Sequence, residues 1–268
     1  MRLSTPARLT LRMIAIAYLA VLVVLPITTV LTKALGPGLA SFWASITTPA
    51  AISALNLTLL ILAIVVPLNV ILGTVAALAL VRGRFRGKAV IQTLLDLPFA
   101  VSPVVVGVAL ISLWGASGWF GALAGAGVKI VFAVPGMVLA TAFVTVPFVV
   151  RELEPVLREL GDDQEQAAAT LGATPWQTFW RITLPSIRWG LLYGTLLTIS
   201  RGLGEYGAVL LVSSNLPGVS QTLTLLVHHR YVDAANAYGA YTAATLLMGL
   251  SLVTLLATAL LERSRRTA

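Results

Sequence analysis

DDQEQAAATLGATPWQTFWRITLP, residues 162–185, is a long polar interruption between apolar runs, and it predicts two short helices joined at a glycine. The two leading aspartates are good N-terminal caps, because a carboxylate accepts free N–H groups and suits the positive end of the helix dipole. Gly172 stands where a left-handed residue would end this first helix. Thr174 followed by Pro175 is typical of a second helix start.

The second helix carries an aromatic stripe. Trp176, Phe179 and Trp180 recur at the i, i+3, i+4 spacing that puts side chains on one helix face. We expect Leu184-Pro185 to end this helix, because proline disrupts helical hydrogen bonding. The stripe has two interpretations: an amphipathic hairpin lying on a membrane surface, where Trp is common, or a knob that inserts into a partner's groove.

The composition is that of a membrane protein. The chain has 268 residues, 58% hydrophobic and 10% charged, with a mean hydropathy of +0.93. A soluble domain of this size cannot bury so much apolar surface. The chain has no cysteine, which excludes disulfides, thiolate nucleophiles and cysteine-based metal sites. His228 and His229 are adjacent and lack further ligands, so we expect no metal site there.

Six stretches are long and apolar enough to cross a bilayer, which needs about 20 residues per helix. We therefore expect an all-α polytopic membrane protein. The first stretch is longer than the apolar core of a signal peptide and no clean A-x-A cleavage site follows it, so we interpret it as retained. The segment 222–227 is too short to span and is expected to be interfacial or re-entrant at the external mouth. The six stretches are 13–32, about 53–81, about 94–115, 130–150, about 187–212 and about 238–261.

The basic residues predict the orientation. The net charge is +8, and most of the Lys and Arg side chains flank alternate ends of the expected spans. The positive-inside rule then places both termini and the 162–185 loop in the cytoplasm, with no need for nucleic acid as a partner. The expected organisation is a cytoplasmic tail at 1–12, one transmembrane permease domain at 13–262, and a second cytoplasmic tail at 263–268. The residues assigned to the cytoplasmic side are Arg2, Arg8, Arg12, Arg82, Arg84, Arg86, Lys88, Arg151, Arg158, Arg181, Arg188, Arg263, Arg265 and Arg266.

Two sets of polar or helix-breaking residues lie inside expected spans. Pro98, Ser102 and Pro103 would bend the third span, either as an irregular helix end or as a gate or pathway wall. Arg201 and Glu205 are four residues apart near the middle of the fifth span, so they can pair along one helix side. That pair either locks helix packing by mutual neutralisation or also offers Arg201 to a passing dianion.

The loop resembles the EAA loop of ABC-importer permeases, the segment that docks into the ATP-hydrolysing subunit. The family pattern is E-A-A, three residues, G, nine residues and I-x-L-P, and this spacing is intact. The motif glutamate is replaced by glutamine, with an acid one place earlier, so the charge expected at the motif position is missing. The resemblance implies that the loop couples the chain to an ATPase through Glu165, Gln166, Ala167, Ala168, Gly172, Trp176, Phe179, Trp180, Ile182, Leu184 and Pro185.

From about Leu55 to the C-terminus the chain resembles the W-type permease subunit of bacterial sulfate/thiosulfate ABC importers. Ser102-Pro103 and Arg151-Glu152-Leu153 favour the W type over the related T-type and molybdate permeases, while Thr224 departs from the pattern. The resemblance implies a MetI-like permease fold with a cytoplasmic coupling helix. The alternatives are a molybdate or tungstate permease and a stand-alone secondary anion carrier. The matching segments are 96–107, 129–156, 170–194 and 201–223.

The same resemblance implies an assembly in the bacterial inner membrane. It would contain a second permease subunit, either T-type or another copy of this chain, two ABC ATPase subunits and an extracytoplasmic sulfate-binding protein, all within membrane lipid. This chain is not expected to be an enzyme or to bind cofactors, because ATP and Mg²⁺ belong to the ATPase. In agreement, Gly87-Lys88 is followed by alanine and lacks the earlier glycine of a phosphate-binding loop. Co-purification with an ATPase would separate this hypothesis from a carrier or an intramembrane enzyme.

Overall fold

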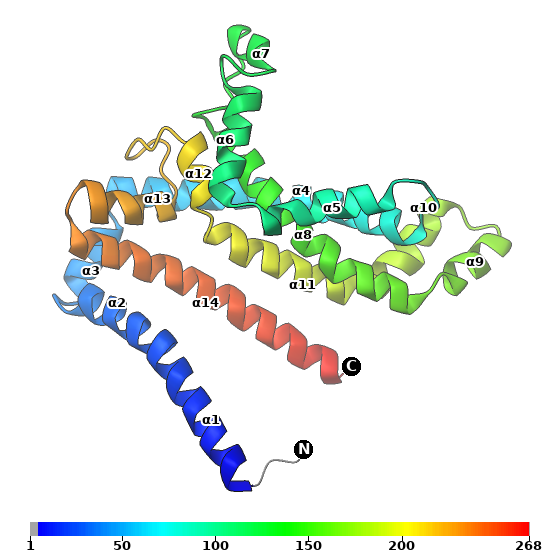
Figure 1. Ribbon diagram of the computed structural model, residues 1–268, viewed down its shortest axis with the longest axis horizontal. Coiled ribbons are helices and arrows are strands. Elements are labelled where there is room, and N and C mark those ends of the chain that lie inside the picture. The colour runs from blue at the N-terminus through cyan, green and yellow to red at the C-terminus, as the bar shows by residue number, and fades with distance from the viewer. Residues whose placement is uncertain (1–4, 268) are drawn as a thin grey trace.

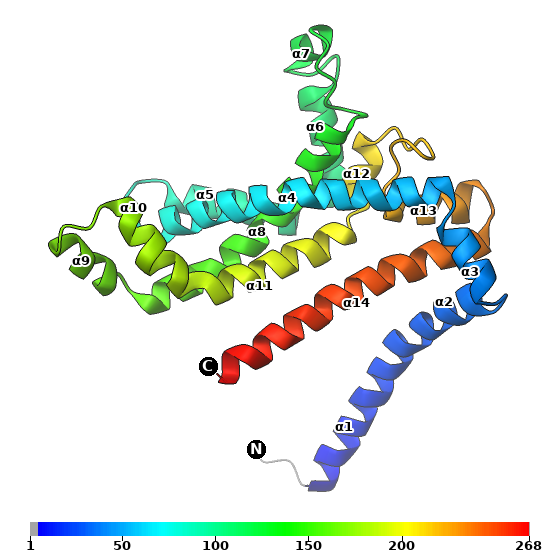
Figure 2. The same cartoon turned by 180° about the vertical axis from the view of Figure 1, so that it is seen from behind.

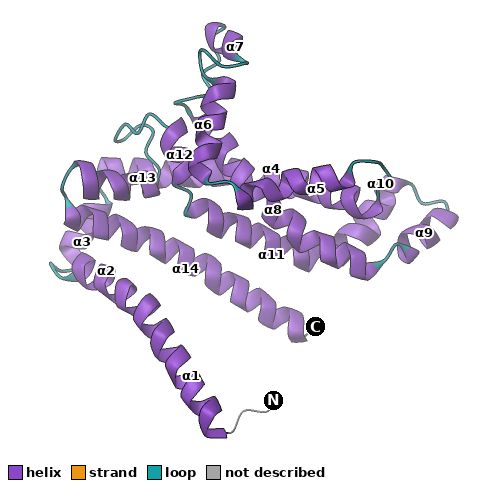
Figure 3. Cartoon of the chain, in the orientation of Figure 1, coloured by secondary structure: helices purple, strands orange, loops and turns teal. Residues whose placement is uncertain are grey.

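The computed structural model describes the backbone of residues 5–267 and, outside 5–8, 124 and 262–267, their side chains. The described residues form helices and loops and contain no strand (Figure 3), which confirms the all-α prediction. Three five-residue π-helical segments, η1 to η3, are inserted between α-helices. The elements are α1 Thr5–Leu19, η1 Ala20–Val24, α2 Leu25–Leu35, α3 Leu39–Ile46, α4 Pro49–Arg82, α5 Lys88–Ala100, α6 Pro103–Trp114, α7 Gly121–Gly125, α8 Val134–Leu160, α9 Asp163–Thr170, α10 Pro175–Thr178, η2 Phe179–Thr183, α11 Leu184–Leu203, α12 Gly207–Val212, α13 Leu223–His228, η3 His229–Asp233 and α14 Ala237–Thr267.

The centre of the molecule is a bundle of α4, α8 and α11 (Figure 1). Glycines let these helices approach closely: a Cβ built on Gly73 of α4 would lie 2.6 Å from Val149 Cβ of α8. A Cβ on Gly194 of α11 would lie 3.1 Å from the Cα of the same α8 residue, Val149. Small residues at helix interfaces are the usual means of close packing in membranes, where apolar burial drives little association.

Four helical runs are long and apolar enough to cross a membrane among the described residues: 9–35, 49–82, 134–160 and 237–261. The bent pair α5–α6 makes a fifth if it is counted as one span, against about six expected. The stretch expected at 187–212 is divided, because α11 ends at Leu203 and α12 begins at Gly207. The 20 residues of α11 correspond to about 30 Å, which is close to the thickness of the hydrocarbon core.

The expected third span is also divided. Helices α5 and α6 meet at an angle of 115°, and α6 with α7 projects from the bundle (Figures 1 and 2). Val101 is extended, and Pro103 begins α6, because proline at the first turn loses no helical hydrogen bond. The prolines therefore bend the chain here as predicted, but they separate two helices instead of curving one.

Most of the segment 222–227 is buried against other helices of the chain, which argues against the interfacial alternative, while the re-entrant alternative stays a prediction. Leu223, Leu225 and Leu226 of α13 are almost inaccessible and pack against α4 and α14. Arg230 in η3 is also buried and donates to Gly239 O, Ser45 O and Thr48 Oγ1. Burial lowers the pKa of Arg230. Arg230 is not among the basic residues that the sequence assigns to the cytoplasmic side.

Helical backbone extends into both expected tails. Helix α1 begins at Thr5, within the 1–12 tail, and α14 runs to Thr267, within the 263–268 tail. The remaining residues of these tails, 1–4 and 268, lie outside the described residues, as do the side chains of Arg263, Arg265 and Arg266.

Candidate functional site

The glycine elbow of the loop is present. Gly172 has φ 82°, the left-handed conformation that glycine adopts without strain, and directly follows the C-terminal end of α9. The N–H of Ala173 then donates to Ala168 O at 3.0 Å, which satisfies a carbonyl of the last turn. Asp162 stands at the N-cap position, but its carboxylate makes no capping hydrogen bond; its backbone carbonyl accepts the N–H of Gln166 instead.

The second helix starts as predicted and does not end as predicted. Thr174 and Gln177 form a reciprocal capping box, with Thr174 N 2.9 Å from Gln177 Oε1 and Gln177 N 3.3 Å from Thr174 Oγ1. Helix α10, η2 and α11 then continue without a break through Leu184-Pro185. The wider π-helical turn, in which Leu184 N donates to Phe179 O, accommodates the proline that was expected to stop the helix.

The aromatic stripe is exposed at the tip of the loop. Trp176 is 69% and Trp180 51% exposed, while Phe179 is half-buried between them. The Trp176 and Phe179 ring centroids lie 6.2 Å apart, and each lies 5.5 Å from that of Trp180. Three contacting rings form one continuous apolar surface, which is most exposed at Trp176. Such a surface is suited to insertion into a groove of a partner.

The remaining motif residues divide between the surface and the base of the loop. Gln166, Ala167 and Pro185 are exposed, whereas Ala168 is buried. Ile182 and Leu184 are half-buried. The exposed Gln166 side chain carries no charge, and the acid next to the motif position is Glu165.

Glu165 carries the charge that the motif position lacks. Its Oε2 lies 2.9 Å from Arg82 Nε, and its Oε1 accepts the hydroxyl of Thr183 at 2.8 Å. Arg82 is the last residue of α4 and was assigned from the sequence only to the cytoplasmic side. Because 83 positions separate the two residues, no local pattern could reveal the pair.

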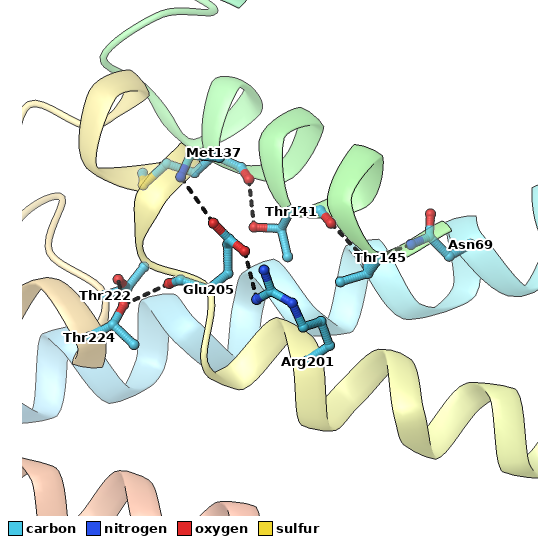
Figure 4. Close-up of polar contacts among 9 residues, drawn as sticks. Asn69, Met137, Thr141, Thr145, Arg201, Glu205, Thr222 and Thr224 are labelled. Carbon is cyan, nitrogen blue, oxygen red and sulfur yellow. Dashed lines mark hydrogen bonds and ion pairs between the residues drawn. The ribbon is translucent and has the colours of Figure 1, made fainter. Parts of the chain in front are cut away.

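The Arg201–Glu205 pair forms, but not in the middle of a helix. Arg201 lies in the last turn of α11 and Glu205 in the break before α12, so the predicted position in the middle of one helix is wrong. Arg201 Nη1 lies 2.7 Å from Glu205 Oε2, with side-chain exposures of 33% and 1% (Figure 4). Glu205 Oε1 also accepts the N–H of Ala208, and Glu205 O accepts the Thr224 hydroxyl. The carboxylate thus neutralises Arg201 and caps α12.

Helix α12, which follows Arg201 and Glu205, contacts the start of α6, where Ser102 and Pro103 lie. A Cβ built on Gly207, at the start of α12, would lie 3.2 Å from Pro103 Cβ at the start of α6. Pro98 is buried within α5, and Ser102 precedes α6 without a side-chain capping bond. The bend at α5–α6 and the break at α11–α12 are therefore neighbouring interruptions of two helices.

Polar side chains also join α4 to α8 near this break (Figure 4). Asn69 is fully buried and donates to Thr145 Oγ1 at 2.7 Å and to Ala142 O at 3.1 Å. Thr145 and Thr141 in turn donate to carbonyls one turn earlier in α8. Asn69 was not predicted as a functional residue, although a single amide within a long apolar run was the available signal.

Among the described residues no group of three or more His, Asp or Glu side chains could hold a metal ion. His229 Nδ1 lies 3.1 Å from Asp233 Oδ2, and the ring of His228 lies against Tyr206.

Comparison with known proteins identifies relatives over nearly the whole chain. A family model described as "binding-protein-dependent transport system inner membrane component" matches residues 69–267. The chain is 48% identical over 250 residues to the sulfate transport system permease protein CysW of Synechococcus elongatus, covering 93% of this chain and 87% of that one. It is 40% identical over 255 residues to the CysT protein of Synechocystis, covering 93% and 87%.

The fold is shared with a solved transporter. A bacterial alginate ABC transporter in complex with an alginate pentasaccharide-bound periplasmic protein contains a chain that superposes with a TM-score of 0.76 at 16% identity. The superposition covers 94% of this chain and 92% of that one. The expected ABC-importer permease fold is confirmed.

Proposed function

The chain belongs to the family of binding-protein-dependent transport system inner membrane components, and from this premise we propose that it is the W-type permease subunit of an ATP-driven importer of sulfate. The observation that supports sulfate as the substrate is the 48% identity, over 93% of the chain, to a protein named as a sulfate permease. The lower identity to a CysT protein, 40%, supports the W type. Thiosulfate, a dianion of similar shape, is included in the proposal.

The two alternatives from the sequence are less well supported. A molybdate or tungstate permease is not favoured by relatives that are named for sulfate. A stand-alone secondary carrier is not favoured by membership of a family defined by dependence on a binding protein. The exposed aromatic stripe is also a feature that a stand-alone carrier does not require.

The proposed assembly contains two permease subunits, two ATPase subunits and a binding protein. This chain would pair with a T-type permease, or with a second copy of itself, and each permease would present its loop to one ATPase subunit. An extracytoplasmic sulfate-binding protein would deliver the anion; the related alginate transporter has been solved with its periplasmic protein. ATP and Mg²⁺ would be held by the ATPase, so this chain contributes no catalytic residue.

The proposed location is the bacterial cytoplasmic membrane, with both termini and the loop on the cytoplasmic side. Helices α4 and α8 end beside the loop, since Arg82 contacts Leu157 and Glu165. Helix α11 leads away from the loop, and α14 runs back in the direction of the loop end of the bundle (Figures 1 and 2). The basic residues at 82–88 and 151–188 gather at this end, which agrees with the positive-inside rule.

The continuous helix from the stripe to Arg201 suggests how docking would act on the pathway. A displacement of the stripe by the ATPase would move α10, η2 and α11 together, because no break separates them. The break at 204–206 then allows α12 to change its angle separately, and α12 contacts the start of α6. Because Glu205 neutralises Arg201, anion selection would rest mainly with the binding protein.

The test is uptake by the reconstituted complex. We expect proteoliposomes containing both permeases and the ATPase to accumulate labelled sulfate only with ATP inside and the sulfate-binding protein outside. Unlabelled molybdate should compete poorly, and a matched complex with a hydrolysis-deficient ATPase is the control. Uptake without ATP would refute the importer, and preferential uptake of molybdate would refute the substrate.

A further inference from the structure

Helix α9 is flanked by two glycines with positive φ angles. Gly161 has φ 64° and Gly172 has φ 82°, and a Cβ built on either would meet no atom within 4 Å. Backbone conformation, and not crowding, therefore favours glycine at both ends of α9. The eight residues of α9 are too few for a helix to persist by itself, and among them only Ala168 is buried. Such a segment needs a tie to the rest of the molecule.

An ion pair provides one such tie. Arg82 Nε lies 2.9 Å from Glu165 Oε2, and both side chains are only 22% exposed. The other carboxylate oxygen of Glu165 accepts the hydroxyl of Thr183, which is buried in η2. Glu165 thus connects α9 both to the end of α4 and to the helix that follows the aromatic stripe.

The guanidinium of Arg82 is held by a third element. Its Nη1 donates to Leu157 O at 3.0 Å and its Nη2 to Gly161 O at 2.5 Å. The last carbonyls of a helix have no partner within the helix and form the negative end of its dipole, so α8 favours a cation here. One planar guanidinium can satisfy these three acceptors at once, whereas a lysine ammonium on its flexible stem is a poor substitute.

We propose that Arg82 is a positioning residue, and that its pair with Glu165 is a strut that transmits ATPase movement from the loop to α4 and α8. This inference rests on the proposed function, in which the aromatic stripe binds the ATPase. The Arg82–Glu165 pair then transmits the resulting displacement. Without the strut, rotation at Gly161 and Gly172 would absorb a displacement of the loop. The partial burial of the pair protects it from the screening that makes exposed ion pairs weak.

The experiment compares Arg82→Gln with Arg158→Gln in the purified complex of both permeases and the ATPase. Arg158 is a matched control, because it lies at the end of α8 that Arg82 contacts. Its side chain is 59% exposed and pairs with Glu154 one turn away. We expect Arg82→Gln to retain the ATPase but to exchange the amide hydrogens of α9 at least about tenfold faster. ATP hydrolysis in this variant should no longer rise when the loaded binding protein is added. Arg158→Gln should match the wild type in all three measurements.

Glu165→Gln provides a second route, because it removes the charge with little change in shape. It should reproduce the loss of stimulated hydrolysis, and the double variant Arg82→Gln with Glu165→Gln should be no worse than either single variant, as expected for residues acting through one interaction. Arg82→Lys should recover part of the stimulation, which loss of folding alone would not allow.

Three results would overturn the strut. These are unchanged α9 exchange with normal stimulation in Arg82→Gln, an equal loss in Arg158→Gln, or release of the ATPase by Arg82→Gln, which would make Arg82 part of the docking surface. Amide exchange requires no transported anion. Failure of the wild-type complex to move sulfate would therefore refute the proposed substrate while the strut is still measured.

Discussion

Substitution of Glu205 by glutamine removes the charge that faces Arg201 and keeps the shape of the side chain. The amide oxygen of glutamine can still accept the N–H of Ala208, so the cap of α12 is retained while the ion pair is lost. The variant therefore isolates the electrostatic role of Glu205. Replacing both residues, as Arg201→Met with Glu205→Gln, leaves no unpaired charge.

The structure sets the expected magnitude. Breaking a buried ion pair by removing one partner costs about 3–5 kcal/mol, because the other charge is left without compensation. The Arg201 side chain is 33% exposed, so partial hydration lowers the expected cost to about 2–3 kcal/mol. For a chain of this size, that corresponds to a fall in Tm of about 4–10 °C. The double variant should recover most of this loss.

The assay is thermal unfolding of the purified complex, followed by the fluorescence of the native tryptophans, with sulfate uptake measured in parallel. If Glu205→Gln unfolds within about 1 °C of the wild type, the pair does not stabilise the break and the reasoning is wrong. If the double variant assembles and hydrolyses ATP in response to the binding protein but moves no sulfate, the packing role fails. Direct contact of Arg201 with the anion would then explain the result.

Three further predictions concern the loop and the topology. Trp176→Ala with Phe179→Ala should weaken ATPase binding by at least about 2 kcal/mol, because exposed aromatic anchors dominate docking; unchanged co-purification would contradict this. Gly172→Val should impose about 1–3 kcal/mol of strain at φ 82° and reduce uptake, so normal transport would show that the elbow is dispensable. Val219→Cys, at a position 70% exposed, should react only with external reagent, and Ser264→Cys only with cytoplasmic reagent; external labelling of Ser264→Cys would mean an odd number of spans.

Features fixed by neighbouring residues were predictable from the sequence. The elbow at Gly172 and the helix start at Thr174 depend on local backbone and capping chemistry, and both are present. The end expected at Pro185 was wrong, because a π-helical turn accommodates the proline at a cost that sequence patterns do not register. Local rules thus predicted the glycine-terminated helix end and the capped helix start, but not the continuation through Pro185.

Features that depend on distant residues were not predictable. The break at 204–206 lies in a glycine-rich run whose sequence predicts one continuous apolar span. Glu205 can accept the N–H of Ala208 only because the chain breaks before α12. The Arg82–Glu165 pair joins elements far apart in the chain. The 115° angle between α5 and α6 likewise depends on packing of α6 against α12, which no periodicity encodes.

The position of α1 and α2 has a consequence for the order in which the protein assembles during synthesis. Within the chain, α2 contacts α3 and α14, and the apolar window of the 9–35 run is 0% buried. Helix α2 therefore meets α14 only after all the helices between them have been made. Meanwhile α4, α6, α8, α12 and α13 can form the larger apolar core, since none of its residues comes from α1 or α2. This core can therefore pack before α14 is available to contact α2.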